Sequence, residues 1–457
     1  MPLVSINPAT GRVIARHREH TAAEVSSALA STHAAFLDWR ALSPTERARH
    51  LTALGASLRK QQAALARLIT AEMGKPLEDA RLEIEKCAAC CDFYAKHAAG
   101  FLKSHRPAGA PKNTRVLFEP LGVILAIMPW NFPFWQLFRA AAPALMAGNT
   151  ILLKHASNTS GCALAIERVF SRARVPAGLL RTLLVSSKSI PAVLKDPRIR
   201  GVTLTGSTTA GRKVGALAGT ALKPAVLELG GSDPYVILAD ADLDLAAETC
   251  AKARLTNAGQ SCVAAKRFIV VESVRAAFEP KFIARMAARR MGDPTAKGTD
   301  FGPLARTDLR DELHAQVQKS VKRGARVLLG GILPPARNKG AFYPATVLSG
   351  VRPGMPAYDE ELFGPVAAII PAKDEADALR IANDTAYGLG AAIFSRNRRR
   401  ARELAQKHLD AGMVFINAQV RSDSSLPFGG VKASGLGREL SAFGIREFVN
   451  IKTLWVE

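Results

Sequence analysis

The sequence lacks the features of a secreted or membrane-embedded protein. Six cysteines in 457 residues do not form a disulfide framework, and the first residues carry no apolar signal-peptide core. The most apolar stretch, residues 122–135, is broken by Pro129, Asn131 and Pro133 and is too short to span a bilayer. We therefore expect no membrane partner, and we predict a reducing, cytoplasmic location.

Acidic residues are also scarce relative to basic ones. The chain has 62 Lys and Arg against 39 Asp and Glu, a formal net charge of +23. A positive surface favours anionic substrates, dinucleotides or nonspecific contact with nucleic acid. The densest basic run, residues 396–402, contains no interleaved aromatic residues, so we interpret it as the solvated face of a helix. No specific nucleic-acid partner is predicted.

A Gly-x-Gly-x-x-Gly fingerprint after an early strand is missing as well. The sequences at 388–390 and 435–437 have two of the glycines, but neither follows a strand and opens a helix with the third in place. The turn from Gly206 to Gly211 is a better phosphate site, because it follows a predicted strand and should open a helix. Glycines let the backbone approach a ligand, and a helix N-terminus presents unpaired N–H groups.

One Cys-x-x-Cys spacing is present, at Cys87, Cys90 and Cys91. It lies in a long Ala-rich region with apolar residues at helical spacing, between Pro44 and about His97. A single Cys pair without a second Cys or His pair is weak support for zinc. We predict buried helix packing for these thiols and no metal site.

The rest of the chain has a clear organisation. The first hundred residues are predicted to be helical, and an extended segment with a turn at Pro120 follows. Strand and helix signals then alternate in two blocks, which predicts parallel α/β sheets. The predicted strands are 149–154, 180–185, 201–205, 234–238 and 268–271, and the predicted helices are 162–171 and 243–256. The tail, 448–456, looks like a strand without a local partner, and with the extended segment it could form an arm between subunits.

The clearest chemical signal is Cys262, which ends the run Asn257-Ala258-Gly259-Gln260-Ser261-Cys262. A thiolate attacks electrophilic carbon, and small residues before it leave room for substrate and cofactor to approach the sulfur. Glu228 opens the sequence Glu-Leu-Gly-Gly upstream and supplies a candidate base. The pair predicts nucleophilic catalysis.

Seven segments, in order, carry a resemblance to the aldehyde dehydrogenase superfamily that covers essentially the whole chain. They are Pro129–Pro133, the strand ending at Lys154, Thr205–Gly211, Glu228–Gly231, Gly259–Cys262, Glu361–Pro365, and Pro427–Gly430 with Ser434-Gly435.

The resemblance implies an aldehyde dehydrogenase-like α/β fold, with two Rossmann-type domains and a β-strand oligomerisation arm. The implied dinucleotide-binding domain is 1–111 with 126–229, the catalytic domain is 230–425, and the arm is 112–125 with 426–457. A homodimer or homotetramer is expected.

The resemblance also implies the catalytic roles. Cys262 would attack the aldehyde to give a thiohemiacetal, whose oxyanion the Asn131 amide and the Cys262 N–H would stabilise. Hydride loss would leave a thioester, which water deprotonated by Glu228 would hydrolyse. Partial burial would raise the pKa of Glu228 toward neutrality.

The implied cofactor is NADP or NAD. The residues expected to bind it are Trp130, Lys154, Ser157, Gly206, Ser207, Gly211, Leu229, Glu361 and Phe363. One departure from the family pattern matters, because many NAD-preferring members have a glutamate where this chain has Ser157. Without that carboxylate, and with Lys154 nearby, a 2′-phosphate should be tolerated.

The implied substrate is an acid semialdehyde such as succinate semialdehyde. Arg139 matches a family arginine that binds the substrate carboxylate, and arginine grips a carboxylate with two parallel hydrogen bonds. Ser424 or Ser425 is a candidate hydroxyl contact, and Phe428 is a further substrate contact. A second family arginine is replaced by Thr256, with Arg254 out of register by two residues.

Three alternatives stay open at this point. The chain is compatible with a broad-specificity aliphatic or aromatic aldehyde dehydrogenase. It is also compatible with an acyl-transferring relative in which coenzyme A replaces water, although the glutamate at position 228 favours hydrolysis. A binding protein that has lost catalysis and attracts nucleic acid by its charge is the third, and the intact candidate catalytic residues argue against it.

Overall fold

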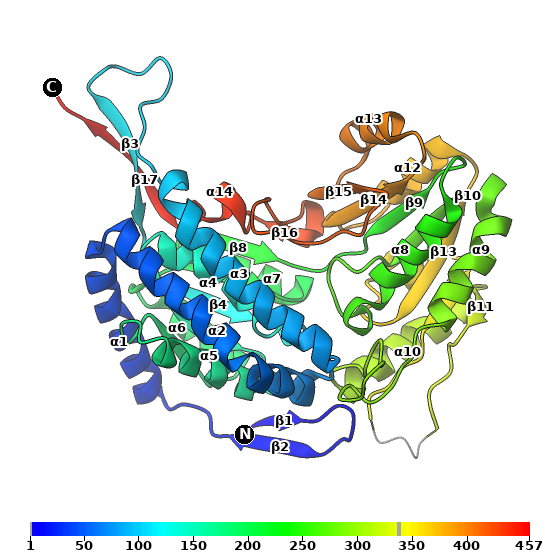
Figure 1. Ribbon diagram of the computed structural model, residues 1–457, viewed down its shortest axis with the longest axis horizontal. Coiled ribbons are helices and arrows are strands. Elements are labelled where there is room, and N and C mark those ends of the chain that lie inside the picture. Colours follow the sequence, from blue (N-terminus) through cyan, green and yellow to red (C-terminus); the bar gives the residue numbers. More distant parts are fainter. Residues whose placement is uncertain (1, 336–339) are drawn as a thin grey trace.

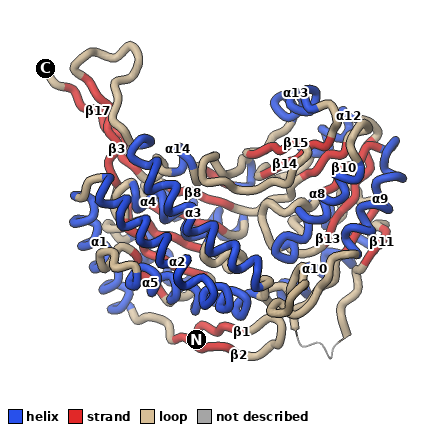
Figure 2. Tube along the Cα trace, in the orientation of Figure 1, coloured by secondary structure: helices blue, strands red, loops and turns tan. Residues whose placement is uncertain are grey.

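We describe a computed structural model of residues 2–335 and 340–457 (Figure 1). Two lobes face each other, each built around its own sheet, and a two-stranded arm projects from the first lobe (Figure 1). In the tube view, helices lie in front of the sheet of the first lobe, whereas strands of the second sheet are visible between its helices (Figure 2). This is the two-domain α/β architecture that the sequence predicted.

The first lobe holds, among the described residues, a six-stranded sheet in the order β16-β8-β7-β4-β5-β6, parallel except for β16. Its strands are β4 (Val123–Met128), β5 (Thr150–His155), β6 (Leu180–Leu183), β7 (Ile199–Thr205), β8 (Ala225–Glu228) and β16 (Gly435–Leu436). Its helical segments are α1 (Ala22–Ala41), α2 (Pro44–Met73), α3 (Leu77–Phe101), α4 (Trp135–Met146), η1 (Ser157–Thr159), α5 (Ser160–Arg172), η2 (Ser187–Ser189), α6 (Ile190–Lys195), α7 (Thr208–Thr220), η4 (Lys432–Ser434) and α14 (Ser441–Gly444).

The second lobe holds, in the same described ranges, a seven-stranded sheet in the order β11-β12-β13-β10-β9-β14-β15, parallel except for β11. Its strands are β9 (Pro234–Ile237), β10 (Arg267–Val271), β11 (Arg326–Leu329), β12 (Thr346–Ser349), β13 (Val366–Ala372), β14 (Gly390–Phe394) and β15 (Met413–Ile416). Its helical segments are α8 (Leu243–Leu255), η3 (Thr256–Gly259), α9 (Glu272–Ala287), α10 (Thr307–Lys322), α11 (Pro356–Asp359), α12 (Glu375–Asn383) and α13 (Arg398–His408).

Local sequence explains where the first two helices begin. Thr21 and Glu24 form a reciprocal capping box at the start of α1, and Ser43 and Glu46 form another at the start of α2. Helix α2 ends at Gly74, whose φ of 81° is left-handed and suits glycine. The predicted helical region from Pro44 to His97 is thereby confirmed as α2 and α3.

The prediction that the first hundred residues are helical was wrong at the N-terminus. Residues there form an antiparallel hairpin of β1 (Leu3–Ile6) and β2 (Val13–His17). Its connecting turn closes with Gly11 N–H donating to the Asn7 carbonyl at 2.8 Å. The Ser5 hydroxyl donates to Glu72 on α2 at 2.6 Å, so a tertiary contact holds the hairpin in place. Its strands are too short to give a clear periodic pattern in the sequence.

The C-terminal strand has no partner near it in sequence, and it pairs instead with the extended segment, as the predicted arm requires. Strand β17 (Val449–Trp455) pairs antiparallel with β3 (Thr114–Pro120) over its whole length, and the two together form the arm (Figure 1). From Val123 onward the chain already belongs to β4 in the first sheet, so the paired arm is narrower than 112–125 with 426–457. The exact domain boundaries stay a prediction.

The three clustered cysteines of α3 are fully buried in the core of the first lobe, as predicted. Burial raises the pKa of each of these thiols. The described residues contain no group of three or more His, Cys, Asp or Glu side chains arranged to hold a metal ion.

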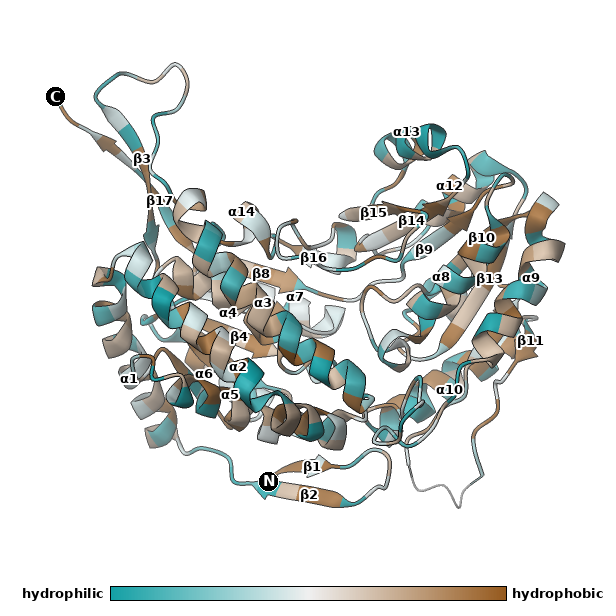
Figure 3. Cartoon of the chain, viewed as in Figure 1, coloured by the Kyte–Doolittle hydropathy of each residue, from teal (hydrophilic) through white to brown (hydrophobic). Residues whose placement is uncertain are grey.

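One surface feature agrees with the sequence prediction. The arginine-rich segment forms the exposed start of α13, which is coloured as hydrophilic in Figure 3. None of the described helices combines the length and the apolar composition needed to cross a membrane.

Candidate active site

The loop that carries Cys262 follows α8 and has an unusual backbone. Asn257, Ala258 and Gly259 have φ values of 54°, 55° and 75°, a left-handed run. A Cβ on Gly259 would lie 2.2 Å from the carbonyl oxygen of Gly364, so only glycine fits there. The prediction that these small residues leave room for substrate and cofactor was wrong, because Ala258 and Gly259 are both buried against the protein itself.

Two buried cationic side chains hold this loop in place by hydrogen bonds to its backbone. The Lys266 ammonium donates to the carbonyl oxygens of Ser261, Cys262 and Ala264 at 3.1, 2.9 and 3.2 Å. Arg254 donates to the carbonyl oxygen of Gly259 at 2.7 Å. Carbonyl groups that would otherwise be buried without donors are thus satisfied, which fixes the position of the thiol.

Cys262 lies where two cavities meet. One cavity, of about 380 Å³, is lined by α3, α4, the cysteine loop and residues 419–422, and we call it the aldehyde cavity. The other, of about 280 Å³, is lined by residues from both lobes, including Trp130, Ser207 and Glu361, and we call it the cofactor cavity. Cys262 and Gln136 line both. Two different molecules can therefore approach one sulfur atom.

The thiol is protonated in this resting arrangement. Burial raises the pKa of Cys262 to about 12, against the opposing influence of Arg139 and Lys266. A thiol with so high a pKa must lose its proton to a base, or gain a nearby positive charge, before it attacks carbon.

Asn131 lies beside the cysteine loop, to which it is hydrogen-bonded. Its side-chain N–H donates to the Gln260 carbonyl at 3.0 Å, and its own carbonyl accepts from the Asn257 amide at 2.9 Å. Asn131 lines the cofactor cavity together with Cys262. The amide is thus held close to the nucleophile, as an oxyanion donor must be.

Glu228 is more deeply buried than a partly solvated base. Neither carboxylate oxygen has a hydrogen-bond partner among the described residues, and the side chain lines neither cavity. Oε1 lies 2.6 Å from the position that a Cβ on Gly429 would take, so that glycine makes room for the carboxyl group. Burial, with the neighbouring Glu439, raises the pKa of Glu228 well above its usual range, the direction that the sequence predicted.

Six of the nine predicted cofactor residues line the cofactor cavity: Trp130, Gly206, Ser207, Leu229, Glu361 and Phe363. Lys154, Ser157 and Gly211 line neither cavity. The Ser207 hydroxyl caps α7 by accepting from the Ala210 N–H at 3.3 Å, and a Cβ on Gly211 would lie 2.3 Å from a Leu229 methyl.

These contacts bear on whether a dinucleotide fits. The turn at Gly206 and the N-terminus of α7 open on the cavity, which offers backbone donors to a pyrophosphate. Gly211 permits the close packing of α7 on the strand end that this geometry needs. Trp130 and Phe363 meet edge to face with ring centroids 5.8 Å apart and give the cavity an aromatic wall. The residues present fit a dinucleotide.

The predicted substrate residues divide in the same way. Arg139 and Phe428 line the aldehyde cavity, whereas Ser424 and Ser425 do not. Arg139 is ion-paired with the buried Glu439, donates to the Thr205 hydroxyl at 3.3 Å, and lies 4.2 Å from the Phe428 ring centroid. The guanidinium of Arg139 therefore already has an ion-pair partner and a hydrogen-bond acceptor within the protein.

Sequence reasoning missed several residues of the aldehyde cavity. They are Lys86 on α3, Gln136 on α4, and Arg421 and Ser422 on the segment after β15. Ser422 lines the cavity, two positions before the serine expected there. No signal in the sequence marks Lys86, because α3 is brought to the cavity only by its packing on α4.

The fold and the site together define an α/β protein in which one cysteine lines two cavities, one of which opens on the Gly206 turn at the start of α7. Residues 2–454 match the aldehyde dehydrogenase family. The chain belongs to the aldehyde dehydrogenase family.

Individual relatives are similar over their full lengths. The chain is 48% identical over 452 residues to the succinate semialdehyde dehydrogenase [NAD(P)+] Sad of Escherichia coli, covering 99% of this chain and 97% of that protein. It is 48% identical to succinate-semialdehyde dehydrogenase [NADP(+)] 1 of Mycobacterium tuberculosis, covering 100% of both. The crystal structure of succinic semialdehyde dehydrogenase from Streptococcus pyogenes in complex with NADP+ superimposes with a TM-score of 0.96 at 35% identity, covering 99% of both chains.

Proposed function

We propose that the protein oxidises succinate semialdehyde to succinate with NADP or NAD. The observation that carries the proposal is the position of Cys262 between the two cavities, one of them lined by several lysine and arginine side chains. The relatives at 48% identity that bear the names of succinate semialdehyde dehydrogenases support the same substrate.

The proposed chemistry begins at the sulfur of Cys262. The thiolate adds to the aldehyde carbon, and the Asn131 N–H with the backbone N–H of Cys262 stabilises the oxygen that becomes negative. When bound, oxidised nicotinamide supplies the hydride acceptor that makes the cysteine adduct a thioester. Water then cleaves the thioester, which releases the carboxylate and restores the thiol.

Glu228 is the proposed base for the water. Its raised pKa makes the carboxylate a stronger base than a solvated glutamate. Because its carboxyl group lines neither cavity in the resting arrangement, we propose that it rotates toward Cys262 or acts through an intervening water.

For the cofactor, we propose that NADP is accepted. Residue 157 is an exposed serine at the start of η1, where a carboxylate would repel a 2′-phosphate, and Lys154 lies at the end of the preceding strand. Turnover with NAD and none with NADP would defeat this part of the proposal.

For the assembly, we propose a homodimer or homotetramer in which the arm of β3 and β17 meets another subunit. The arm leaves Ile451, Leu454 and Trp455 exposed, and apolar side chains on a projecting strand pair favour burial in an interface. Light scattering that gives the mass of one chain would contradict it. A reducing, cytoplasmic location is proposed as well, because all six cysteines are free.

The function is tested by the absorbance of reduced nicotinamide. The assay compares succinate semialdehyde with butanal, each with NAD and with NADP, and uses Cys262→Ala as the control. Selective turnover of the acid aldehyde that Cys262→Ala abolishes is the expected result. Equal turnover of both aldehydes would replace the proposal with a broad-specificity aldehyde dehydrogenase, and no turnover of any aldehyde would refute it.

A further inference from the structure

Lys86 occupies an unusual place in the aldehyde cavity. Six cationic side chains line that cavity: Lys75, Lys86, Arg139, Lys252, Arg289 and Arg421. Three of them are ion-paired within the protein, since Lys75 pairs with Glu83, Arg139 with Glu439, and Arg289 with Glu248. Within the described ranges no carboxylate pairs with the other three, which are Lys86, Lys252 and Arg421.

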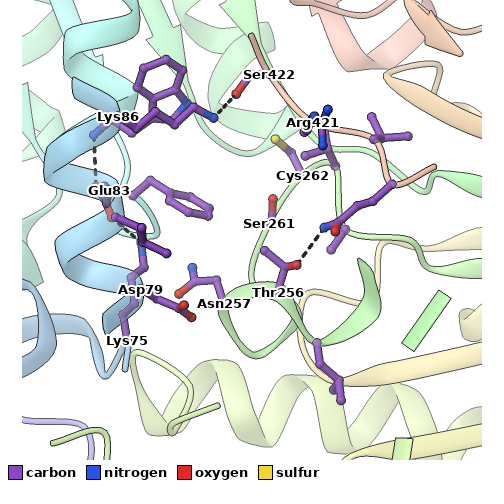
Figure 4. A pocket seen from close by; sticks show the side chains of 18 of the residues that line it. Lys75, Asp79, Glu83, Lys86, Thr256, Asn257, Ser261, Cys262, Arg421 and Ser422 are labelled. Carbon is purple, nitrogen blue, oxygen red and sulfur yellow. Dashed lines mark hydrogen bonds and ion pairs between the residues drawn. The ribbon is translucent and has the colours of Figure 1, made fainter. Parts of the chain in front are cut away.

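Of these three unpaired cations, only Lys86 is held in a defined position. Lys252 and Arg421 are exposed, whereas Lys86 is half-buried. Its ammonium donates to the Ser422 hydroxyl at 2.7 Å (Figure 4). The same ammonium lies 4.3 Å from the centroid of the Trp135 ring. A hydroxyl and an aromatic face fix the ammonium without neutralising its charge.

The neighbouring acid cannot neutralise Lys86, because it is already used. Glu83, one turn earlier on α3, accepts from the backbone N–H groups of Phe134 and Trp135 at 2.9 and 3.0 Å. It also pairs with the buried Lys75. Glu83 therefore caps α4 and compensates the charge of Lys75. Among the residues that the structure describes, the charge of Lys86 is left without an ion-pair partner.

The hydrogen-bonding capacity of Lys86 is only partly used. An ammonium carries three N–H donors, and the structure accounts for one of them, toward Ser422. A carboxylate in the cavity can accept a charge-assisted hydrogen bond from another. Burial makes such a bond stronger than it is at the surface.

From this arrangement we propose that Lys86, positioned by Ser422 and Trp135, binds the carboxylate of the aldehyde substrate and is the main determinant of preference for acid aldehydes. The proposal rests on the proposed oxidation of succinate semialdehyde and adds the residue that recognises the charge. Arg139 lines the same cavity, but its pair with Glu439 leaves it less able to offer a net positive charge.

The first test is the Michaelis constant of Lys86→Met for succinate semialdehyde and for butanal. Loss of a charge-assisted bond should raise KM for the acid aldehyde about 10- to 100-fold. KM for butanal and kcat for both substrates should stay within about threefold, since Lys86 does not touch the reacting atoms. Turnover of butanal also reports that the variant is folded.

Matched variants separate recognition from general electrostatics. Lys252→Met removes an unpaired lysine of the same cavity and should leave the preference for the acid aldehyde unchanged. Lys86→Arg should restore most of that preference, and Ser422→Ala should weaken it by a few fold because the ammonium loses its anchor. An equal loss in Lys86→Met and Lys252→Met would overturn the proposal in favour of a diffuse positive field.

A binding measurement avoids turnover altogether. Succinate should protect Cys262 of the unmodified enzyme from alkylation by iodoacetamide, whereas neutral butyramide should not. Lys86→Met should need at least about 10-fold more succinate for the same protection. Unchanged protection in Lys86→Met would overturn the proposal.

The two proposals fail in different ways. If the unmodified enzyme does not prefer succinate semialdehyde to butanal, the proposed function fails. If it does prefer the acid aldehyde and Lys86→Met keeps that preference, the function stands and the role of Lys86 is refuted.

Discussion

The two cavities that meet at Cys262 differ in the charge of the side chains that line them. The aldehyde cavity is lined by six lysine and arginine side chains and three carboxylates. The described lining of the cofactor cavity contains no lysine or arginine, and it includes the carboxylates Glu312 and Glu361. Near the sulfur, the lysine and arginine side chains therefore lie on the aldehyde side. The other side relies on backbone donors at the start of α7 and on aromatic walls.

The strongest test of this division removes the residue that both cavities share. Cys262→Ala should lower kcat by at least about 1000-fold with every aldehyde and either cofactor, because the nucleophile is lost. Reduced-nicotinamide absorbance measures the rate, and an unchanged melting temperature shows that the fold is intact. Residual turnover within tenfold of the unmodified enzyme would mean that another group carries the chemistry.

Glu228 gives the next largest expected effect. Glu228→Gln should slow steady-state turnover by about 100- to 10,000-fold, because the thioester then lacks its base. Since the pKa of Glu228 is raised, the base is protonated at low pH, so kcat of the unmodified enzyme should rise with pH. The substitution should remove that rise.

A rapid-quench experiment distinguishes this role from a structural one. If Glu228 acts after hydride loss, Glu228→Gln should still give a burst of reduced cofactor of about one equivalent per active site. Absence of any burst would place the defect before the thioester.

The positive charge that Lys86 adds to the aldehyde cavity should be lost at high pH. Burial lowers the pKa of Lys86 to about 8. The other groups that act on it are Arg139 from α4, then Cys87, Cys90 and Glu83 from α3, and also Asp423. Above that pKa the ammonium loses its proton, so the ratio of kcat/KM for succinate semialdehyde to that for butanal should fall by up to about 10-fold between about pH 7 and pH 9.

Taking a ratio cancels the common effects of pH on Cys262 and Glu228. Lys86→Arg should keep the preference for the acid aldehyde while losing its dependence on pH, because arginine stays charged. A ratio that falls equally in Lys86→Arg would contradict the assignment.

The smallest expected effect concerns the cofactor side alone. Ser157→Glu should raise KM for NADP about 10-fold and leave KM for NAD and for both aldehydes nearly unchanged, since the new carboxylate repels only the 2′-phosphate. Initial rates at saturating aldehyde measure it. If KM rises equally for both cofactors, residue 157 does not distinguish them.

Much of the site follows from the sequence because its parts are contiguous motifs. The strand, turn and helix around Gly206 are set by local glycines and by the Ser207 cap, so they were predictable in place and in type. The run before Cys262 was equally visible. Its purpose was misread, since the contact of Gly259 with Gly364 spans more than a hundred positions of the chain.

Sequence alone was enough to predict the family, the candidate nucleophile, the strand and helix alternation of two mostly parallel sheets, and the burial of the α3 cysteines. These depend on residue type, spacing and periodicity, which are local properties. Tertiary structure alone decided which charges are free. Lys86 and Lys75 look alike in sequence, but the packing of α3 on α4 gives Glu83 to Lys75 and leaves Lys86 facing the aldehyde cavity. Electrostatic compensation depends on distances in space, and spacing along the chain does not fix those.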